Sequence, residues 1–196
     1  DHTIAIGKNT GQDLESASDN NTFIGQNAGQ QLAFGDENIA IGYVAFQNPK
    51  SGSYNVAIGR GSLNGGANAT NDNFRYNVAL GYATAAFTSG QKNIAIGYGS
   101  MRNSGANGTN IDDSIGIGYE TLRALEKGDG NIAIGEQAME NTETGSYNIA
   151  LGYQTLKQGN NGLSGVSNDR NIAMGYSTAQ SMKDWIFFSK SISNRC

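Results

Sequence analysis

The 196-residue sequence predicts an all-β fold, a parallel β-solenoid of about ten coils. A short apolar phrase, NIAIG at 38–42, recurs ten times, and its copies lie 16 to 23 residues apart. The 28 glycines, about twice the usual share of about 7%, interrupt every segment that could form a helix. A unit this short cannot bury its own apolar face, so repeated units stack on one another. The phrases end at Gly7, Gly25, Gly42, Gly59, Gly81, Gly97, Gly118, Gly135, Gly152 and Gly175.

Each phrase predicts one short strand. Ile or Val stands three residues before the glycine in nine copies, Ala stands two before it in eight, and Ile, Leu or Met directly precedes it in all ten. Such alternation with β-branched residues is typical of a strand with two different faces. We expect the two large apolar side chains of each phrase to fill the interior of the coil. The Ala between them is expected to face outward, where a neighbouring subunit can approach closely. The predicted oligomer would bury surface that a thin coil lacks.

The residues around the strand predict how each coil closes. The glycine provides a turn with positive φ. A small residue three places later and an apolar one after it predict a second short strand. Asn stands four residues before the glycine in eight copies, and its amide can bond to the same group one coil away.

Composition excludes several classes of function. The net charge of −4 disfavours nucleic acid and anionic membranes as partners. No run of about 18 apolar residues is present, so we expect no direct membrane insertion by this segment. His2 is the only histidine and Cys196 the only cysteine. We therefore expect no catalytic residues, no metal and no cofactor.

The repeated phrase, N-[IV]-A-[ILM]-G with a small residue three places later, resembles the YadA-like head repeats of trimeric autotransporter adhesins and the related repeats of bacteriophage tail fibres. The resemblance covers about residues 3 to 180, and the unit of about 17 residues is closer to the phage-fibre variants. It implies a left-handed parallel β-roll with three chains around one axis. It also implies an extracellular place, on a virion tail fibre or a bacterial cell surface, and non-enzymatic binding of host-cell surface carbohydrate or protein.

Two regions follow from this interpretation. Residues 1–180 are expected to form the solenoid head, and residues 181–196 a C-terminal cap or the start of a neck or tip segment. The second region contains no copy of the phrase and places four large apolar residues together, from Trp185 to Phe188.

Three longer intervals, at 64–76, 102–113 and 158–170, predict loops that emerge from the solenoid. The alternative is that they are tolerated surface insertions. The candidate receptor-binding residues in them are Asn68, Asn71, Asp72, Phe74, Arg75, Asn107, Asn110, Asp112, Asp113, Asn160, Asn161, Asn168, Asp169 and Arg170.

A column of tyrosines directly after the motif glycine is the second candidate surface. Aligned aromatic rings suit carbohydrate or protein contact, although a structural ladder of rings stacked from coil to coil explains the same regularity and is favoured. The residues are Tyr43, Tyr82, Tyr98, Tyr119, Tyr153 and Tyr176.

Two kinds of enzyme and an ice-binding protein are the alternatives to an attachment protein. Paired acids such as Asp36/Glu37 and Asp112/Asp113 would be needed by a glycan-processing, tailspike-like hydrolase. Their spacing matches no calcium motif, so solvated loop charge is favoured. A left-handed β-helix acyltransferase would require a catalytic histidine and a six-residue period. An ice-binding protein would require a regular array of Thr or Asn side chains. The position three residues after the glycine instead mixes Ala, Ser and Thr, which makes a poor array of this kind.

Overall fold

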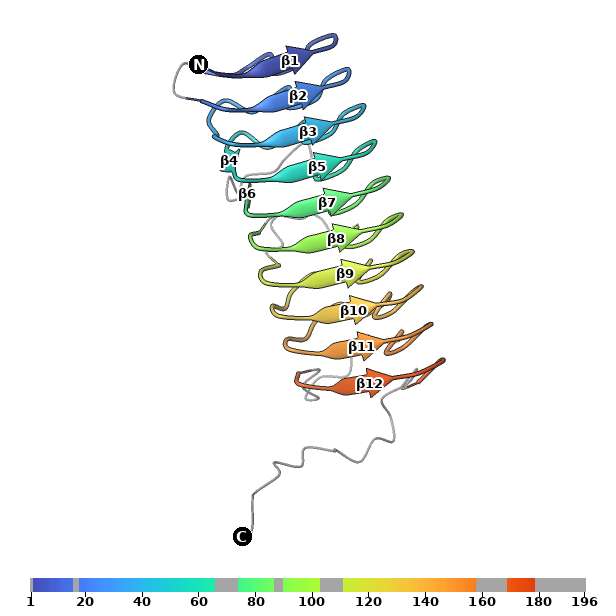
Figure 1. Cartoon of the computed structure of the whole chain (residues 1–196). Coiled ribbons are helices and arrows are strands. Elements are labelled where there is room, and N and C mark those ends of the chain that lie inside the picture. Colours follow the sequence, from blue (N-terminus) through green and yellow to red (C-terminus); the bar gives the residue numbers. More distant parts are fainter. Residues whose placement is uncertain are drawn as a thin grey trace.

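The computed structural model describes residues 2–15, 18–65, 74–86, 90–102, 111–157 and 169–178. Within these ranges the chain forms parallel strands and no helix, and the strands stack as a β-solenoid (Figure 1). The prediction of an all-β, parallel β-solenoid is thereby confirmed. The strands are β1 (Ile4–Ile6), β2 (Thr22–Ile24), β3 (Ile39–Ile41), β4 (Gly52–Ser53), β5 (Val56–Ile58), β6 (Phe74–Arg75), β7 (Val78–Leu80), β8 (Ile94–Ile96), β9 (Ile115–Ile117), β10 (Ile132–Ile134), β11 (Ile149–Leu151) and β12 (Ile172–Met174).

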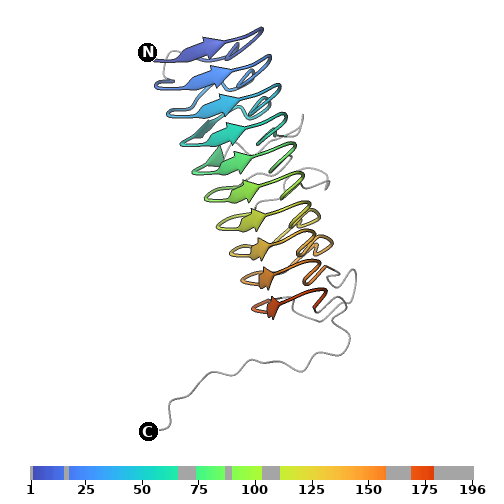
Figure 2. The ribbon, with the colours of Figure 1, turned by 45° about the vertical axis from the view of Figure 1, so that its right-hand side comes forward.

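Ten of these strands form one parallel sheet in the order β1-β2-β3-β5-β7-β8-β9-β10-β11-β12. Equivalent residues of neighbouring phrases pair with each other, as Ala40 does with Ala57. Figure 2 shows the strands stacked in chain order, so each step along the sheet is one turn of the solenoid. Strands β4 and β6 form a separate two-stranded sheet.

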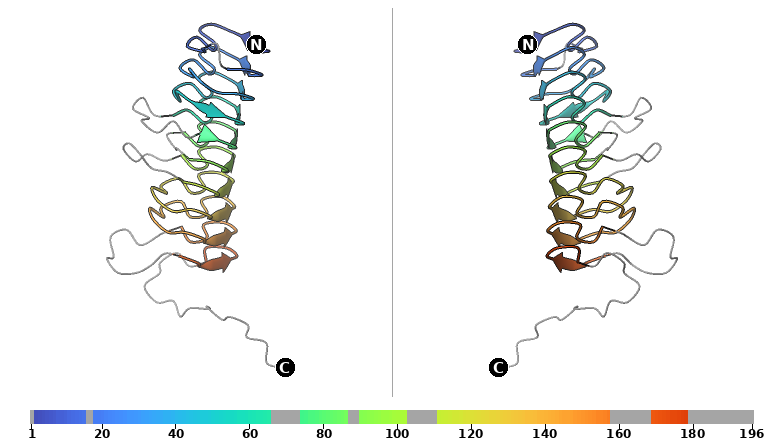
Figure 3. Two further views of the ribbon diagram at one scale, coloured as in Figure 1. Left: turned by 90° about the vertical axis from the view of Figure 1, so that its left-hand side faces the viewer. Right: turned by 90° about the vertical axis from the view of Figure 1, so that its right-hand side faces the viewer.

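The expected orientation of the phrase is wrong. The alanines of the sheet point into the solenoid, and Ala40, Ala95 and Ala133 have no exposed surface. The large side chains on either side of them point outward, so that Ile134, for example, is 40% exposed. Edge-on views place the sheet along one side of the solenoid (Figure 3), and its outer face therefore carries the Ile columns.

The narrow interior explains this orientation. The residue four places after the glycine supplies the large buried side chain, as Phe46 and Met139 do. Phe23 takes the place of an alanine. Gly11 and Gly29 then stand four places after the motif glycine, where other turns have the large buried residue. A Cβ on Gly29 would lie 2.9 Å from the Phe23 ring, and a Cβ on Gly11 would lie 3.1 Å from it. One large residue thus fills the space that each turn offers, and two would overpack it.

The prediction of a second strand at the small and apolar pair is also wrong. The chain there forms a turn in which alternate residues have positive φ, 52° at Val44 and 49° at Phe46. This alternation turns successive N–H groups in opposite directions. Val44 N donates to Gln26 O of the preceding turn, and Phe46 N donates to Ser62 O of the following turn. The backbone is therefore paired along the axis without being a strand.

The glycine after each strand is required for two reasons. Its φ lies between 122° and 139° in all ten phrases, a conformation that side chains disfavour. A Cβ on Gly97 would also lie 2.2 Å from the carbonyl oxygen of Gly118 in the next turn.

The Asn column forms the ladder that its recurrence predicts. Nδ2 of Asn38, Asn55, Asn77, Asn148 and Asn171 donates to the Oδ1 of the Asn one turn earlier, at 2.9 to 3.1 Å. The same Oδ1 accepts the backbone N–H of the later residue. These amides are mostly fully buried, so the ladder satisfies polar groups that water cannot reach.

Candidate functional site

The tyrosines that follow the motif glycine form an outward-facing column. We call Tyr43, Arg60, Tyr82, Tyr98 and Tyr119 the aromatic strip. The rings of Tyr82, Tyr98 and Tyr119 are stacked in sequence, with centroids 5.2 Å apart and planes within 10° of parallel. The guanidinium of Arg60 lies between the rings of Tyr43 and Tyr82, at 5.4 and 5.5 Å from their centroids. The strip therefore spans five successive turns without a break.

Stacking limits what the strip can offer to a ligand. The tyrosines of the strip are each between 42% and 45% exposed. Because Tyr98 has a neighbouring ring on each side, its faces are covered and its edge and hydroxyl remain available. Farther along the same column Tyr153 stacks on Tyr176 at 4.9 Å. The predicted ring stacking is confirmed.

A second aromatic column lies at the other end of the strands, at the residue before the motif Asn. Tyr54 stacks on Tyr76 at 5.0 Å, and Arg170 lies 5.9 Å from the centroid of the Tyr147 ring. The apolar sheet face is thus bordered by aromatic residues at both ends of its strands. Tyr54, Tyr76 and Tyr147 were not among the predicted candidates.

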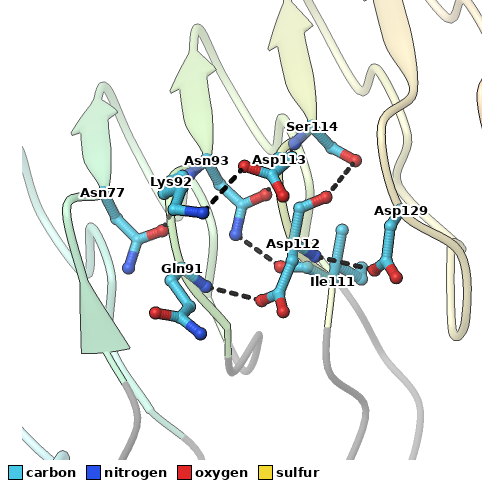
Figure 4. Close-up of polar contacts among 9 residues, drawn as sticks. All are labelled: Asn77, Gln91, Lys92, Asn93, Ile111, Asp112, Asp113, Ser114 and Asp129. Carbon is cyan, nitrogen blue, oxygen red and sulfur yellow. Dashed lines mark hydrogen bonds and ion pairs between the residues drawn. The ribbon is translucent and has the colours of Figure 1, made fainter.

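Two of the acidic candidates, Asp112 and Asp169, belong to a column six residues before the motif glycine whose side chains cap backbone N–H groups. Oδ1 of Asp112 accepts the N–H of Gln91 at 2.8 Å, and Asp129 accepts the N–H of Asp112 at 3.0 Å (Figure 4). Asp36 accepts in the same way from Asp19, and Asp169 from Ser146. The carboxylates are therefore placed as structural acceptors rather than as a facing acid pair. The repeated Asp or Ser at this position was the signal that sequence analysis missed.

Asp113 lies beside this column and faces a different partner. Its carboxylate forms an ion pair with Lys92 at 3.6 Å, and both side chains are more than half exposed (Figure 4). A pair this exposed contributes little to stability.

The structure places the remaining loop candidates as follows. Phe74 is corrected from a surface loop to the interior, where its ring packs edge-on against Phe46 at 6.0 Å. Arg75 and Arg170 are exposed. The other candidates lie outside the described residues, and these are Asn68, Asn71, Asp72, Asn107, Asn110, Asn160, Asn161 and Asn168. The expected cap at 181–196 also lies outside them.

One charged cluster is centred on a largely buried carboxylate. The Glu140 side chain, 7% exposed, lies 3.1 Å from Arg123 of the preceding turn and 3.0 Å from Lys157 of the following turn. Lys157 also donates to Gln137 at 2.8 Å. The cluster joins three turns through one carboxylate.

The hydroxyls three residues after the glycine point inward as well. Thr84, Thr121 and Thr155 have no exposed surface. The Thr84 hydroxyl donates to the carbonyl of Gly81 at 3.1 Å. A column of buried hydroxyls cannot form an ice-binding surface.

Carboxylates near the end of the aromatic strip act on Tyr119. The negative charge of Glu120 is the main cause that raises the pKa of Tyr119, with smaller effects from desolvation, Tyr98 and other carboxylates. The phenol therefore stays neutral to higher pH than an ordinary tyrosine.

No group of three or more His, Cys, Asp or Glu side chains within the described residues is arranged to hold a metal ion. The described segments also contain no helix of the length and apolarity needed to cross a membrane.

No family model matches the chain, and neither a curated protein nor a solved structure matches it.

Proposed function

We propose that the chain is the trimeric, non-enzymatic head of a host-attachment protein, a receptor-binding or spacer segment of a phage tail fibre or a bacterial surface adhesin. In this proposal the ten phrases form ten coils of a left-handed roll, and the protein acts outside the cell. The observation that carries the proposal is the apolar outer face of the ten-stranded sheet.

That face is continuous and almost free of polar groups. Of the twenty outward side chains of the ten strands, only Thr22 carries a hydroxyl, and none is charged. Soluble monomers rarely expose an apolar patch larger than a few hundred Å². Strands about 4.8 Å apart carry this face along the whole sheet, which favours its burial against other copies of the chain.

Identical chains bury a face of this kind best around a common axis. A closed assembly leaves no copy of the face in water. Three flat faces can meet along one axis, as the resemblance to the adhesin heads implies. The interface thus consists of the Ile columns, and the alanines serve the interior of each chain.

The polar groups also favour a scaffold over an enzyme. Asp36, Asp112, Asp129 and Asp169 each use a carboxylate oxygen to accept a backbone N–H from a neighbouring turn. A glycan hydrolase requires a pair of carboxylates free to face the substrate. Attachment requires only exposed surface repeated on three chains, whose combined avidity exceeds that of one site by about 10²–10⁴-fold.

Binding of the purified chain to arrays of immobilised cell-envelope glycans and matrix proteins tests the proposal. We expect binding by the assembled protein that weakens by about 100-fold or more when assembly is blocked. The binding partner should be released chemically unchanged. Release of shortened glycan would instead identify the hydrolase, and equal binding by monomer and trimer would contradict the avidity mechanism.

A further inference from the structure

We propose that the aromatic strip binds an extended, neutral polysaccharide lengthwise, with one sugar residue opposite each turn of the solenoid. This inference rests on the proposed attachment function and assigns it both a ligand class and a surface. The strip consists of Tyr43, Arg60, Tyr82, Tyr98 and Tyr119, as defined above.

The first argument is the accessible chemistry of the strip. Tyr98 stacks on Tyr82 and on Tyr119, so a sugar ring cannot lie flat against its faces. Each exposed edge nevertheless carries a phenol hydroxyl that both donates and accepts hydrogen bonds. Arg60 lies between two rings and adds donors at the same level. A row of such groups matches the row of hydroxyls along a sugar chain.

The second argument is the repeat distance. The ring centroids are 5.2 Å apart, at both steps from Tyr82 to Tyr119. An extended glycan joined by equatorial β-1,4 linkages advances by nearly the same distance for each sugar. Neighbouring sugars in such a chain face opposite ways, so each turn meets one sugar and equivalent contacts recur at every second turn. A globular protein has no such period and would match only one or two turns.

The third argument is charge. The strip contains one cation, Arg60, and its guanidinium is already held between two rings. At the opposite end, the carboxylates of Glu120 and Glu136 act on Tyr119. A polyanion would meet repulsion there and attraction at a single point only. An uncharged sugar chain has no such conflict.

The strip also lies outside the proposed trimer interface. Its residues follow the glycine at which the chain turns away from the sheet, whereas the Ile columns lie within the strands. Each trimer would carry three such strips. A long glycan chain or several neighbouring chains could then be held at more than one strip.

Calorimetric titration of the intact protein tests this inference with β-1,4-linked glucose oligomers of increasing length. We expect the affinity to rise with each added sugar up to five, the number of residues in the strip, and then to level off. α-1,4-linked glucose oligomers have the same sugar but a curved chain, and they should not bind. Equal binding of the two series, or affinity independent of length, would overturn the proposal.

A variant pair assigns the binding to the strip. Tyr98→Phe keeps the ring and its stacking and removes one hydroxyl, and it should weaken binding of the β-linked hexamer by about three- to tenfold. Tyr76→Phe removes a hydroxyl from the other aromatic column and should change nothing. Unaltered binding by Tyr98→Phe would overturn the assignment.

The array experiment separates failure of this inference from failure of attachment. Protein that binds the arrays but not the oligomers retains the attachment function and refutes the polysaccharide site. Loss of binding to a matrix protein in Tyr98→Phe, without binding of any oligomer, would identify a protein partner and also refute it.

Discussion

Asn55 donates from Nδ2 to Oδ1 of Asn38, one turn earlier, at 3.0 Å, and accepts at its own Oδ1 from Asn77, one turn later, at 3.1 Å. A single buried side chain thus connects three turns. Its Nδ2 also donates to the carbonyl of Phe74 at 2.9 Å. This amide stabilises the stack through polar contacts where most cores use apolar packing.

Replacing Asn55 by Leu should destabilise the fold strongly. The buried N–H of Asn77 and the carbonyl of Phe74 would each lose a partner, at about 1–3 kcal/mol per group. The free energy of unfolding from urea denaturation measures the loss. Asn55→Ser is the matched control, because Ser114 occupies the same position in its turn and its Oγ accepts the N–H of Asn131 at 3.1 Å. A small loss for Asn55→Leu would show that the ladder contributes little.

Replacing Ala133 by Phe should disrupt the interior of the chain itself. Ala133 has no exposed surface, and Met139 is the large buried residue of the same turn. We expect destabilisation of about 1–3 kcal/mol from overpacking, measured as a lower midpoint of denaturation.

The double variant Ala133→Phe with Met139→Gly provides the control, because it reproduces the natural combination of Phe23 and Gly29. It should recover part of the lost stability. If the single variant folds normally and only fails to assemble, the alanine faces a partner and the interior position is refuted.

Replacing Ile134 by Lys should block assembly and leave the chain folded. Ile134 is 40% exposed in the single chain, on the sheet face proposed as the trimer interface. A charge buried there without a partner is costly. Sedimentation should report monomers in place of trimers, with an unchanged β-sheet circular dichroism spectrum. Glu136→Lys adds the same side chain just beyond the strand and should leave three chains per particle; a trimer of the Ile134 variant would refute the interface.

Replacing Glu120 by Gln should lower the pKa of Tyr119 toward its ordinary value of 10.0. The carboxylate opposes formation of the negatively charged phenolate, so its removal makes ionisation easier. Titration of the ζ carbons of the tyrosines by NMR measures the change. An unchanged Tyr119 would show that Glu120 is not the dominant neighbour.

The repeat alone predicted the strands, their parallel stacking and the Asn ladder. Equivalent residues such as Ala40 and Ala57 pair because the sequence around them is nearly the same. Alternation distinguishes two faces of a strand but does not say which one is inside. The information was present elsewhere, in Phe23. A large residue accompanied by Gly11 and Gly29 marks an interior position of limited volume.

The turn after each glycine was harder to predict. Positive φ at Val44 and Leu122 contradicts the local preference of these side chains. Pairing with the turns on both sides imposes the conformation, so it arises from stacking and not from the residue itself. The acidic column was missed for a different reason. Asp112 and Asp169 were interpreted as loop charges, although their role depends on a backbone N–H one turn away.

The Asn ladder keeps the same geometry whatever length of chain lies between its members. The bond from Asn55 to Asn38 spans 17 residues, that from Asn77 to Asn55 spans 22, and that from Asn171 to Asn148 spans 23, all between 2.9 and 3.1 Å. A phrase that contains this Asn therefore carries its own means of joining the stack. A duplicated or deleted phrase would change the length of the rod by one step and leave every other joint intact. The distance over which such a rod reaches is thus set by the number of phrases in the gene.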